Sequence, residues 1–546
     1  MKKIFSSYTP IALAATMLLG SCAKKIDDAF VNPNADVKQP VEVLLPNIIA
    51  NMTISYAAAG TNYGPQNDGL YIGRYVQFWA TNTTANQYDR MGGATGASDI
   101  LGSIWAMHYY GQGQNLNRMV EWATQDQKWD YVGVGYAIRA WSWLTLTDTY
   151  GDVILKEAFN TSQLVFHYDE QKDVYAEVRR LCHVALANLN RTDGNVSQAN
   201  LLKGDQFMNG GDVNKWKKFT YGVLARSFSH LTNKTKGTDY LPDSALYYAN
   251  LAMKTNAENT VATFSNVGGT GTFSYYAPYR GNIGTLRQSR FIADLMSGSN
   301  NAFLGVNDPR AWYIIRENPN GTFKGIRPNK GTDALTTNDQ PANFWGGAFS
   351  STTAPANDNT CRYIFKNAPL WPIMTASEMA FIRAEIYFKQ GDKTNALAAY
   401  KEGIKLNFDQ LIADYSTSVP TANVMTATTR DNFLANAAVV PSESALTLSH
   451  IMLQKYIALY GWGINETWVD LRRYHYNLDT DGGLQVYRDF APPSGSDLYP
   501  DNNSKVVYRA RPRYNSEYLY NVDELRRIGA LALDYNTLEQ WFSIKP

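Results

Sequence analysis

The chain has 546 residues and a balanced charge, with 50 Lys and Arg against 49 Asp and Glu. This balance argues against a nucleic acid or an anionic surface as the main partner. Aromatic residues make up 13% of the chain, with 36 Tyr and 13 Trp, whereas there are three Cys and six His. The composition therefore favours recognition by flat, amphipathic rings over metal or nucleophile chemistry. We expect no cofactor and no metal site.

The N-terminus has the features of a bacterial lipoprotein leader. Lys2 and Lys3 precede an apolar run over residues 11–19, which is shorter than the roughly 20 residues that span a bilayer but suits a secretory leader. Leu19-Gly20-Ser21-Cys22 matches the lipobox, in which cleavage leaves a lipid-bearing Cys at the N-terminus. We predict a signal peptide over 1–21, lipidation of Cys22 and a charged, flexible tether over 22–40. The alternative is an ordinary leader with a chance Cys.

Helical periodicity recurs from residue 41 to about 255. Residues 131–150 are apolar almost all round, which predicts a buried helix. Apolar residues between 174 and 189 repeat at helical spacing, and this pattern indicates that Cys182 is a small core residue rather than a nucleophile. Two further helices are predicted, over residues 216–231 and 244–253.

The clearest helix pair is predicted between residues 371 and 411. Thr375 followed by Glu378 is typical of a capping box, which places a helix start near residue 376. Gly391-Asp392 separates this helix from a second one. Small residues on the facing sides, with tyrosines between them, resemble a tetratricopeptide unit; these are Ala384, Ala396 and Gly403 with Tyr387 and Tyr400. One such pair cannot bury its outer face, so we predict a mainly α, tetratricopeptide-like superhelix.

Loop-rich regions interrupt this predicted scaffold of residues 41–255 and 372–476. Between residues 256 and 371 only Arg290 to Met296 is predicted as a clear helix, while Gly, Asn, Thr, Ser and many rings dominate. A stretch of this length without regular structure is uncommon unless it is functional or contains short strands. We therefore predict a binding insertion over 256–371 and an irregular C-terminal segment over 477–546, within a single domain of residues 41–546.

Several segments together resemble the SusD/RagB family of outer-membrane lipoproteins. Each motif is weak alone, but they occur in the family's order along nearly the whole chain. They are the lipobox, Tyr150-Gly151-Asp152-Val153, Lys215-Trp216-Lys217-Lys218-Phe219 with Arg226, Glu378 with Ala384, Gln454-Lys455-Tyr456, the run from Glu466 to Arg473, and Arg511-Pro512-Arg513 with Glu517 and Asn521.

The resemblance implies four tetratricopeptide-like helix pairs and a lipid-anchored protein on the cell surface. Family members lie over a TonB-dependent outer-membrane transporter and capture oligosaccharides or, in some members, peptides, without catalysis. The run from Glu466 to Arg473 looks like the family's structural motif, so we do not interpret it as an active site. The usual binding regions are the segment after the first helix and the long insertion.

Binding of a glycan requires flat apolar faces with amide or guanidinium groups beside them. For each ring the alternative is core packing, but we expect at least two rings of the set to line a glycan site. The candidate residues are Arg74, Trp79, Asn82, Tyr88, Arg90, Tyr276, Tyr279, Trp312, Asn343 and Trp345.

Other chemistries have weaker support in the sequence. A peptide-binding member of the same family is one alternative, and a glycoside hydrolase is another, although no motif identifies a pair of catalytic carboxylates. Residues 477–482 begin like a calcium-binding loop, but Arg488 occupies the position of the expected Glu, so we predict a turn. A disulfide between Cys182 and Cys361 is possible in an oxidising compartment.

Overall fold

The structure is a computed structural model that describes residues 38–56, 62–84, 87–92, 100–265 and 272–546. The predicted signal peptide, Cys22 and most of the predicted tether lie outside the described residues. Residues 41–546 form one compact unit. Helices dominate this unit, and its described strands span two to five residues. The prediction of a mainly α fold is confirmed.

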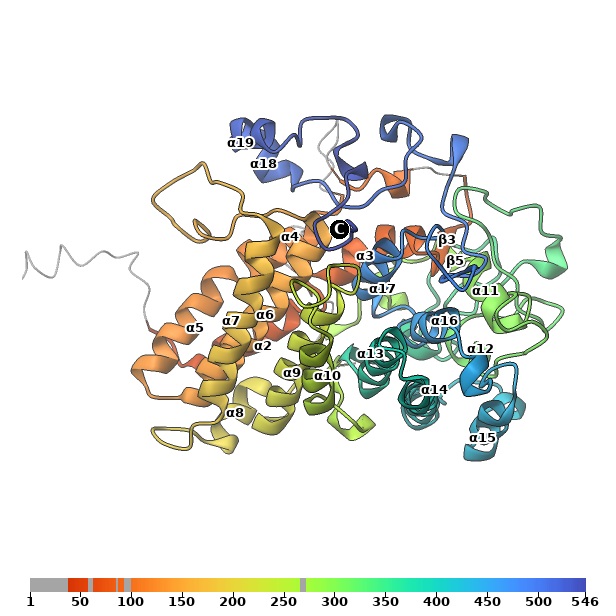
Figure 1. Cartoon of the computed structure of the whole chain (residues 1–546), viewed down its shortest axis with the longest axis horizontal. Coiled ribbons are helices and arrows are strands. Elements are labelled where there is room, and N and C mark those ends of the chain that lie inside the picture. The colour runs from red at the N-terminus through yellow and green to blue at the C-terminus, as the bar shows by residue number, and fades with distance from the viewer. Residues whose placement is uncertain (1–37, 57–61, 85–86, 93–99, 266–271) are drawn as a thin grey trace, which may run out of the picture. The chain divides into compact units, whose positions relative to one another are not determined.

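The first helical block covers residues 41–251 (Figure 1). Successive helices pack as neighbours: α5 on α6, α6 on α7, α7 on α9 and α9 on α10. A π-helical stretch, Met107–Gln112, joins α4 to α5. The helices are α2 (Val41–Ala50), α3 (Pro65–Tyr75), α4 (Ser103–Ala106), α5 (Gly113–Gln125), α6 (Trp129–Tyr150), α7 (Gln171–Leu189), α8 (Gln198–Asp205), α9 (Val213–Ser229) and α10 (Pro242–Leu251).

The second block covers residues 376–473 and continues the array. Helix α13 packs along α14, on α10 of the first block and on α16, so the helix pairs follow one another as in a tetratricopeptide-like superhelix (Figure 1). The helices are α13 (Ala376–Lys389), α14 (Lys393–Asp414), α15 (Ala427–Ala435), α16 (Leu448–Ala458) and α17 (Ile464–Arg473).

The predicted pair α13–α14 forms where expected, with one difference at its start. The Thr375 hydroxyl accepts a hydrogen bond from the Glu378 backbone N–H, 3.2 Å away, which confirms the cap. The Glu378 side chain does not return to the cap but is buried against α9. Gly403 allows the close approach of the helices, because a Cβ there would lie 2.8 Å from the Phe381 ring.

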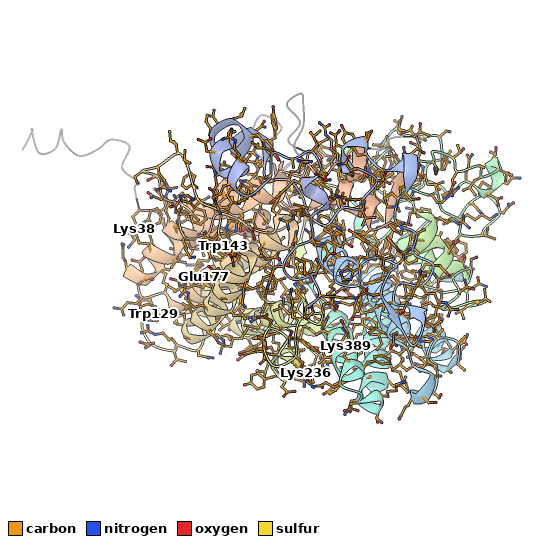
Figure 2. All side chains as sticks on the ribbon, turned by 45° about the horizontal axis from the view of Figure 1, so that its top comes forward. Lys38, Trp129, Trp143, Glu177, Lys236 and Lys389 are labelled. Carbon is orange, nitrogen blue, oxygen red and sulfur yellow. The ribbon has the colours of Figure 1, made fainter. Side chains whose placement is uncertain are left out.

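Helix α6 is the central element of the first block. It is buried nearly all round, as its composition predicted, because α5, α7 and α9 surround it. The Trp143 ring, labelled in Figure 2, packs on His108 and Tyr109 of the π-helical stretch, with ring centroids 4.0 and 6.1 Å apart. Within the part of the chain that the structure describes, no helix is both long enough and apolar enough to cross a membrane.

The loop-rich insertion is fastened to the scaffold by short strands. β3 (Trp79–Thr81) pairs with β5 (Leu286–Gln288), and β4 (Thr260–Thr263) pairs with β6 (Leu370–Met374), both antiparallel. The insertion also contains α11 (Arg290–Ser297) and the single turn α12 (Ala311–Ile314). Short strands and short helices therefore take the place of long helices in the predicted insertion of residues 256–371.

The C-terminal segment folds over the scaffold with little regular structure. β7 (Thr480–Asp481) and β8 (Leu484–Gln485) form a hairpin, so the turn predicted at the calcium-loop-like sequence is confirmed. Two short helices follow, α18 (Tyr514–Tyr520) and α19 (Val522–Arg527). The remaining short hairpin pairs β1 (Ser55–Tyr56) with β2 (Asn62–Tyr63).

Candidate functional site

Trp79, a predicted glycan-stacking residue, lies in the core. Its indole is fully enclosed, and its Nε1 donates a hydrogen bond to the Leu70 carbonyl at 3.3 Å. The ring meets Tyr276 edge to face, with centroids 5.5 Å apart, and lies so close to Gly73 that a Cβ there would be 2.4 Å from it. No face of this indole is available to a sugar.

Three more candidates are buried in the same cluster or beside it. The Tyr276 hydroxyl donates to the Gln66 carbonyl at 3.0 Å, and Trp345 Nε1 donates to the Tyr276 carbonyl at 2.9 Å. Asn343 is buried, and its Oδ1 accepts from the backbone N–H groups of Trp345 and Gly347. These side chains hold the insertion together and are not available to a ligand.

The candidates between residues 74 and 90 also have internal partners. Tyr88 is buried, and its hydroxyl points to the Asp497 carbonyl at 3.5 Å. Half-buried Arg74 and Arg90 lie over the rings of Tyr71 and Tyr499, at 5.1 and 5.4 Å from the ring centroids. Asn82 donates to the Phe349 carbonyl at 3.3 Å.

The interpretation of Trp79, Tyr88, Tyr276, Asn343 and Trp345 as an exposed glycan platform is therefore wrong for this structure. Rings dominate the insertion because it has few regular hydrogen-bonded elements, and burial of large rings stabilises it instead. Among the ten candidates, Tyr279 is the most exposed, at 55%, and it lies against Phe273 with ring centroids 4.4 Å apart.

Trp312 lines a groove, which we call the Trp312 groove. Its volume is about 540 Å³, and it lies between α11, α12, the turn at residues 321–323 and the segment 422–429. The indole is half-buried, and its ring meets Phe323 edge to face at 5.0 Å, which fixes the ring in place. The groove therefore offers a held aromatic face of the kind that stacks on a sugar ring.

Amide and hydroxyl groups surround this ring. Asn307 and Asn423 line the groove from different segments, and neither side chain has a hydrogen-bond partner within the described residues. Thr322 and Thr429 add hydroxyls. The indole can stack on the ring of a glycan, and the two amides and two hydroxyls beside it can form hydrogen bonds with the glycan's hydroxyl groups.

The sequence analysis identified Trp312 but missed its partners. Asn423 and Thr429 lie in the segment between α14 and α16, which falls inside the predicted scaffold of residues 372–476. Asn307 precedes α12 by four residues and carries no motif. The one available signal was the pair of rings Trp312 and Phe323 on either side of the turn at Gly321, which places two aromatics at one edge of the insertion.

The charged run in α17 forms a buried network instead of an active site. Glu466 lies 3.3 Å from Arg226, Asp470 pairs with Lys455 at 2.8 Å, and Arg473 pairs with Glu385. Each pair joins α17 to another helix. The interpretation of this run as a structural element is confirmed, and Glu466, Asp470 and Arg473 are all buried.

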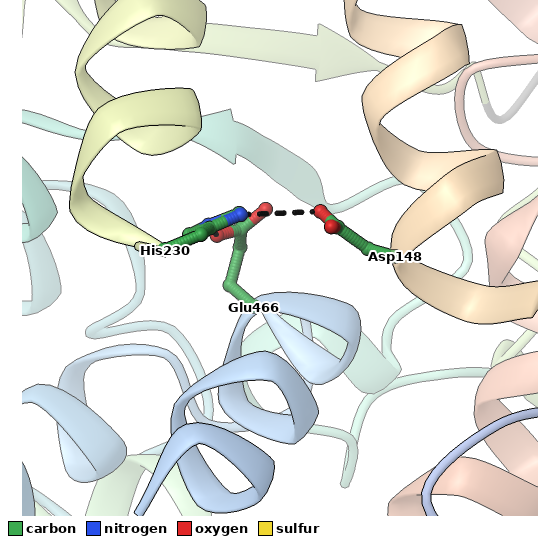
Figure 3. Close-up of side chains that lie close together, drawn as sticks. All are labelled: Asp148, His230 and Glu466. Carbon is green, nitrogen blue, oxygen red and sulfur yellow. Dashed lines mark hydrogen bonds and ion pairs between the residues drawn. The ribbon is translucent and has the colours of Figure 1, made fainter. Parts of the chain in front are cut away.

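Asp148, His230 and Glu466 lie together at the centre of this network (Figure 3). The Asp148 carboxylate is 3.3 Å from Nδ1 of His230 and the Glu466 carboxylate is 2.9 Å from Nε2. Burial lowers the pKa of His230, but the two carboxylates outweigh it and raise this pKa to about 9. Each ring nitrogen faces one carboxylate, so a doubly protonated imidazolium, which donates from both nitrogens, suits this arrangement.

The chain belongs to a SusD-like family. Residues 34–483 match the family model SusD-like_2, whose description is "Starch-binding associating with outer membrane". The family assignment drawn from the sequence motifs is confirmed. A search of curated proteins finds no match.

Solved structures of this family share the fold at low sequence identity. A SusD/RagB family protein from Bacteroides thetaiotaomicron is 17% identical, with a TM-score of 0.68, over 93% of this chain and 100% of that chain. A chitin-binding SusD homolog from Flavobacterium johnsoniae is also 17% identical, with a TM-score of 0.61, over 93% and 99%. At this identity the likeness establishes the fold.

Proposed function

We propose that this protein is a cell-surface lipoprotein that captures oligosaccharides without catalysis and delivers them to a TonB-dependent outer-membrane transporter. Membership of a family described as starch-binding and outer-membrane-associated supports the general role. The Trp312 groove is the observation that carries the proposal to this chain, because it has a held indole and two amides that lack a partner among the described residues. The lipid anchor at Cys22 and the transporter partner belong to the same proposal.

The few contacts that the groove offers are enough for weak, reversible capture of a ligand. A dissociation constant from millimolar to micromolar corresponds to about −4 to −8 kcal/mol. By analogy with base stacking, one ring contributes about 1–3 kcal/mol, and each hydrogen bond adds about 1 kcal/mol. One indole and a few amide or hydroxyl contacts are therefore enough for a protein that must release its ligand.

The carboxylate content of the groove does not suit hydrolysis of a glycoside. Hydrolysis of a glycoside normally requires two carboxylates on either side of the bond. Among the described residues lining the Trp312 groove, Asp308 is the only carboxylate, and it accepts hydrogen bonds of 2.6–3.2 Å from Arg310. A lone carboxylate bound to a buried guanidinium supports a binding role.

An exposed apolar surface supports the transporter partner. The loop at residues 164–165 and the segment 519–533 expose large apolar side chains, and Asn521 holds the two segments together through hydrogen bonds to the Phe166 backbone. Exposed patches of this kind mark interaction sites. Charges beside it form pairs of opposite sign, which favours a protein over an anionic lipid surface. The exposed side chains are Leu164, Val165, Leu519, Tyr520, Leu531 and Leu533.

Affinity gel electrophoresis with soluble neutral polysaccharides tests the proposal. We expect at least one glycan to retard the protein, and Trp312→Ala to weaken this retardation by about tenfold, the loss of one stacked ring. Asn423→Ala removes a side chain that has no hydrogen-bond partner in the described part of the chain, so it should weaken binding less and leave the melting temperature unchanged.

Tyr247→Ala is the matched control, because Tyr247 is an exposed ring on α10 outside the groove. It should bind glycans like the unmodified protein. If no glycan retards the protein while peptides bind it, the oligosaccharide proposal is wrong and the peptide-binding alternative is favoured.

A further inference from the structure

A second cavity lies along α11 beside the Trp312 groove, and we call it the Arg290 cavity. Its volume is about 460 Å³. Phe291, Tyr88 and Gln77 are buried side chains in its wall, and the Pro492-Pro493 pair forms another part of it. Its remaining walls carry charged side chains. The proposed function does not use this cavity.

The cations of the Arg290 cavity retain free hydrogen-bond donors. Arg290 touches Asp294 only through Nε, at 3.2 Å, and within the described residues its terminal nitrogens have no partner. The Arg290 backbone N–H donates to the Ile326 carbonyl at 3.0 Å, which brings the neighbouring Arg327 beside it. Arg327 binds Asp333 through Nε and Nη2 and leaves Nη1 available among the described contacts. Two guanidinium groups that line one cavity and have spare N–H donors are suited to a carboxylate.

The aspartates of the same cavity already have donors. Asp497 accepts from Lys330 at 2.6 Å, and Asp489 accepts from the Asn301 backbone and amide at 2.7 and 3.0 Å. The cavity lining has three cationic and three anionic side chains, Arg290, Arg327 and Lys330 against Asp294, Asp489 and Asp497. A single ligand carboxylate therefore enters a cavity whose lining carries no net charge. It would lie next to the unused N–H donors of Arg290 and Arg327.

The Arg290 cavity and the Trp312 groove meet at the end of α11. Ser297 lines the groove and Ser299 lines the cavity. Their hydroxyl oxygens are 3.2 Å apart, and neither side chain is buried. A chain of sugar residues that lies on Trp312 can therefore continue past these two serines into the Arg290 cavity.

We infer that the two cavities form one extended site for an acidic glycan, in which Trp312 stacks on one sugar ring and Arg290 with Arg327 binds the carboxylate of a uronic acid residue further along the chain. This inference rests on the proposed function and specifies its substrate class. Arg290 and Arg327 are then the residues that determine specificity for the charge.

Affinity gels with uronic acid polymers and their methyl esters test the inference, because esterification removes the charge and keeps the backbone. The probes are polygalacturonate, alginate and hyaluronan. Because the Arg290 and Arg327 side chains are 57% and 53% exposed, we expect at least one acid form to bind about three- to fivefold more tightly than its ester. Added salt should weaken binding of the acid form and leave binding of the ester unchanged.

Arg290→Gln should abolish the preference for the acid form while retaining binding of the ester. Arg180→Gln is the matched control, because Arg180 is 60% exposed and pairs with an acid one helical turn away, as the 57% exposed Arg290 does. Asp294→Asn, which removes one negative charge from the cavity wall, should strengthen binding of the acid form. Arg290→Gln and Asp294→Asn alter partly exposed side chains, so both variants should melt like the unmodified protein.

The outcomes separate the two proposals. If neutral glycans bind through Trp312 and no acid form is preferred, or if Arg290→Gln keeps the preference, the acidic-glycan inference is overturned and the proposed function stands. If no glycan of either kind binds, the proposed function fails and the inference fails with it.

Discussion

The Arg226 guanidinium donates two hydrogen bonds of 2.7 Å to the Glu378 carboxylate, although 152 positions separate the two residues. The pair joins α9 of the first helical block to α13 of the second. Both side chains are buried, so each charge depends on the other. The contact explains why Glu378 does not complete the capping box that its spacing from Thr375 predicts.

We expect Glu378→Gln to lower the free energy of unfolding by about 3–5 kcal/mol, because it leaves a buried guanidinium without its main counter-charge. Urea unfolding followed by circular dichroism measures this loss. Thr375→Ala, which removes only the helix cap, should cost about 1 kcal/mol. Equal losses for the two variants would contradict a role for the ion pair beyond helix capping.

The His230 imidazolium should make stability depend on pH. Burial by itself lowers the pKa of His230. The neighbouring carboxylates of Asp148 and Glu466 outweigh this effect and raise the pKa to about 9. The pKa of His230 is higher in the folded protein than the value of about 6.5 in the unfolded chain, so the charged imidazolium stabilises the fold. This stabilisation is fully present below pH 6.5 and is lost as the pH rises through 9. Its full size is roughly 3 kcal/mol.

His230→Gln should therefore be less stable than the unmodified protein at pH 6 by a larger margin than at pH 9.5. Urea unfolding at the two pH values measures both margins. Glu466 has the opposite dependence: burial raises its pKa, but Arg226 and His230 outweigh burial and lower it to about 2. Its contribution is therefore complete above the unfolded value of about 4.3 and is lost as the pH falls from there through 2. A margin that does not change with pH would show that His230 is neutral in the fold.

The helical scaffold could be predicted from the sequence because its signals are local. The cap at Thr375, the break at Gly391 and the small residues between α13 and α14 each depend on neighbours within one or two helical turns. Gly403 is an example, since only a residue without Cβ allows the Phe381 ring to approach so closely. These local signals and the order of the family motifs were sufficient for the fold.

The site could be predicted only in part because burial of a ring depends on distant residues. Trp79 and Trp312 both lie close to a turn-forming segment in the sequence, residues 81–84 and 307–309 respectively. In the structure one indole packs on Tyr276, nearly two hundred residues away in the chain, and the other lines a groove completed by Asn423. Nothing near either Trp in the sequence distinguishes the two outcomes.

Trp79→Ala should therefore behave as a core variant. We expect a loss of about 3–5 kcal/mol in the free energy of unfolding, the usual cost of removing a buried indole, whereas Trp312→Ala should cost much less because its ring is half-buried. Thermal and urea unfolding of both variants measure the difference. A Trp79→Ala protein that kept its stability but lost glycan binding would place that indole in the ligand site after all.

Cys22→Ser tests the predicted lipid anchor, which lies outside the described residues. Two acyl chains hold a protein on a membrane at about 0.8 kcal/mol per buried methylene group. We expect the native chain to partition into the detergent phase of Triton X-114 and the variant into the aqueous phase. Ser21→Ala, which keeps the cysteine, should partition like the native chain.

The exposed apolar surface at residues 164–165 and 519–533 yields a prediction about the transporter. A charge placed in an apolar interface loses hydration without gaining a partner, so Leu164→Glu with Leu519→Glu should strongly reduce co-purification with an outer-membrane transporter from cells of the source organism. Both side chains are exposed, Leu164 at 83%, so the double variant should fold and still bind glycans in affinity gels.

Leu478→Glu is the control for the added charge, because Leu478 is an exposed leucine on the hairpin segment outside this surface. It should leave co-purification unchanged. Capture and delivery are then separable: the surface variant binds glycans but co-purifies poorly with the transporter, whereas Trp312→Ala co-purifies with the transporter but binds glycans about tenfold more weakly. If the double variant co-purifies as well as the native chain, the apolar surface is not the transporter contact, and the glycan-binding groove is unaffected by that result.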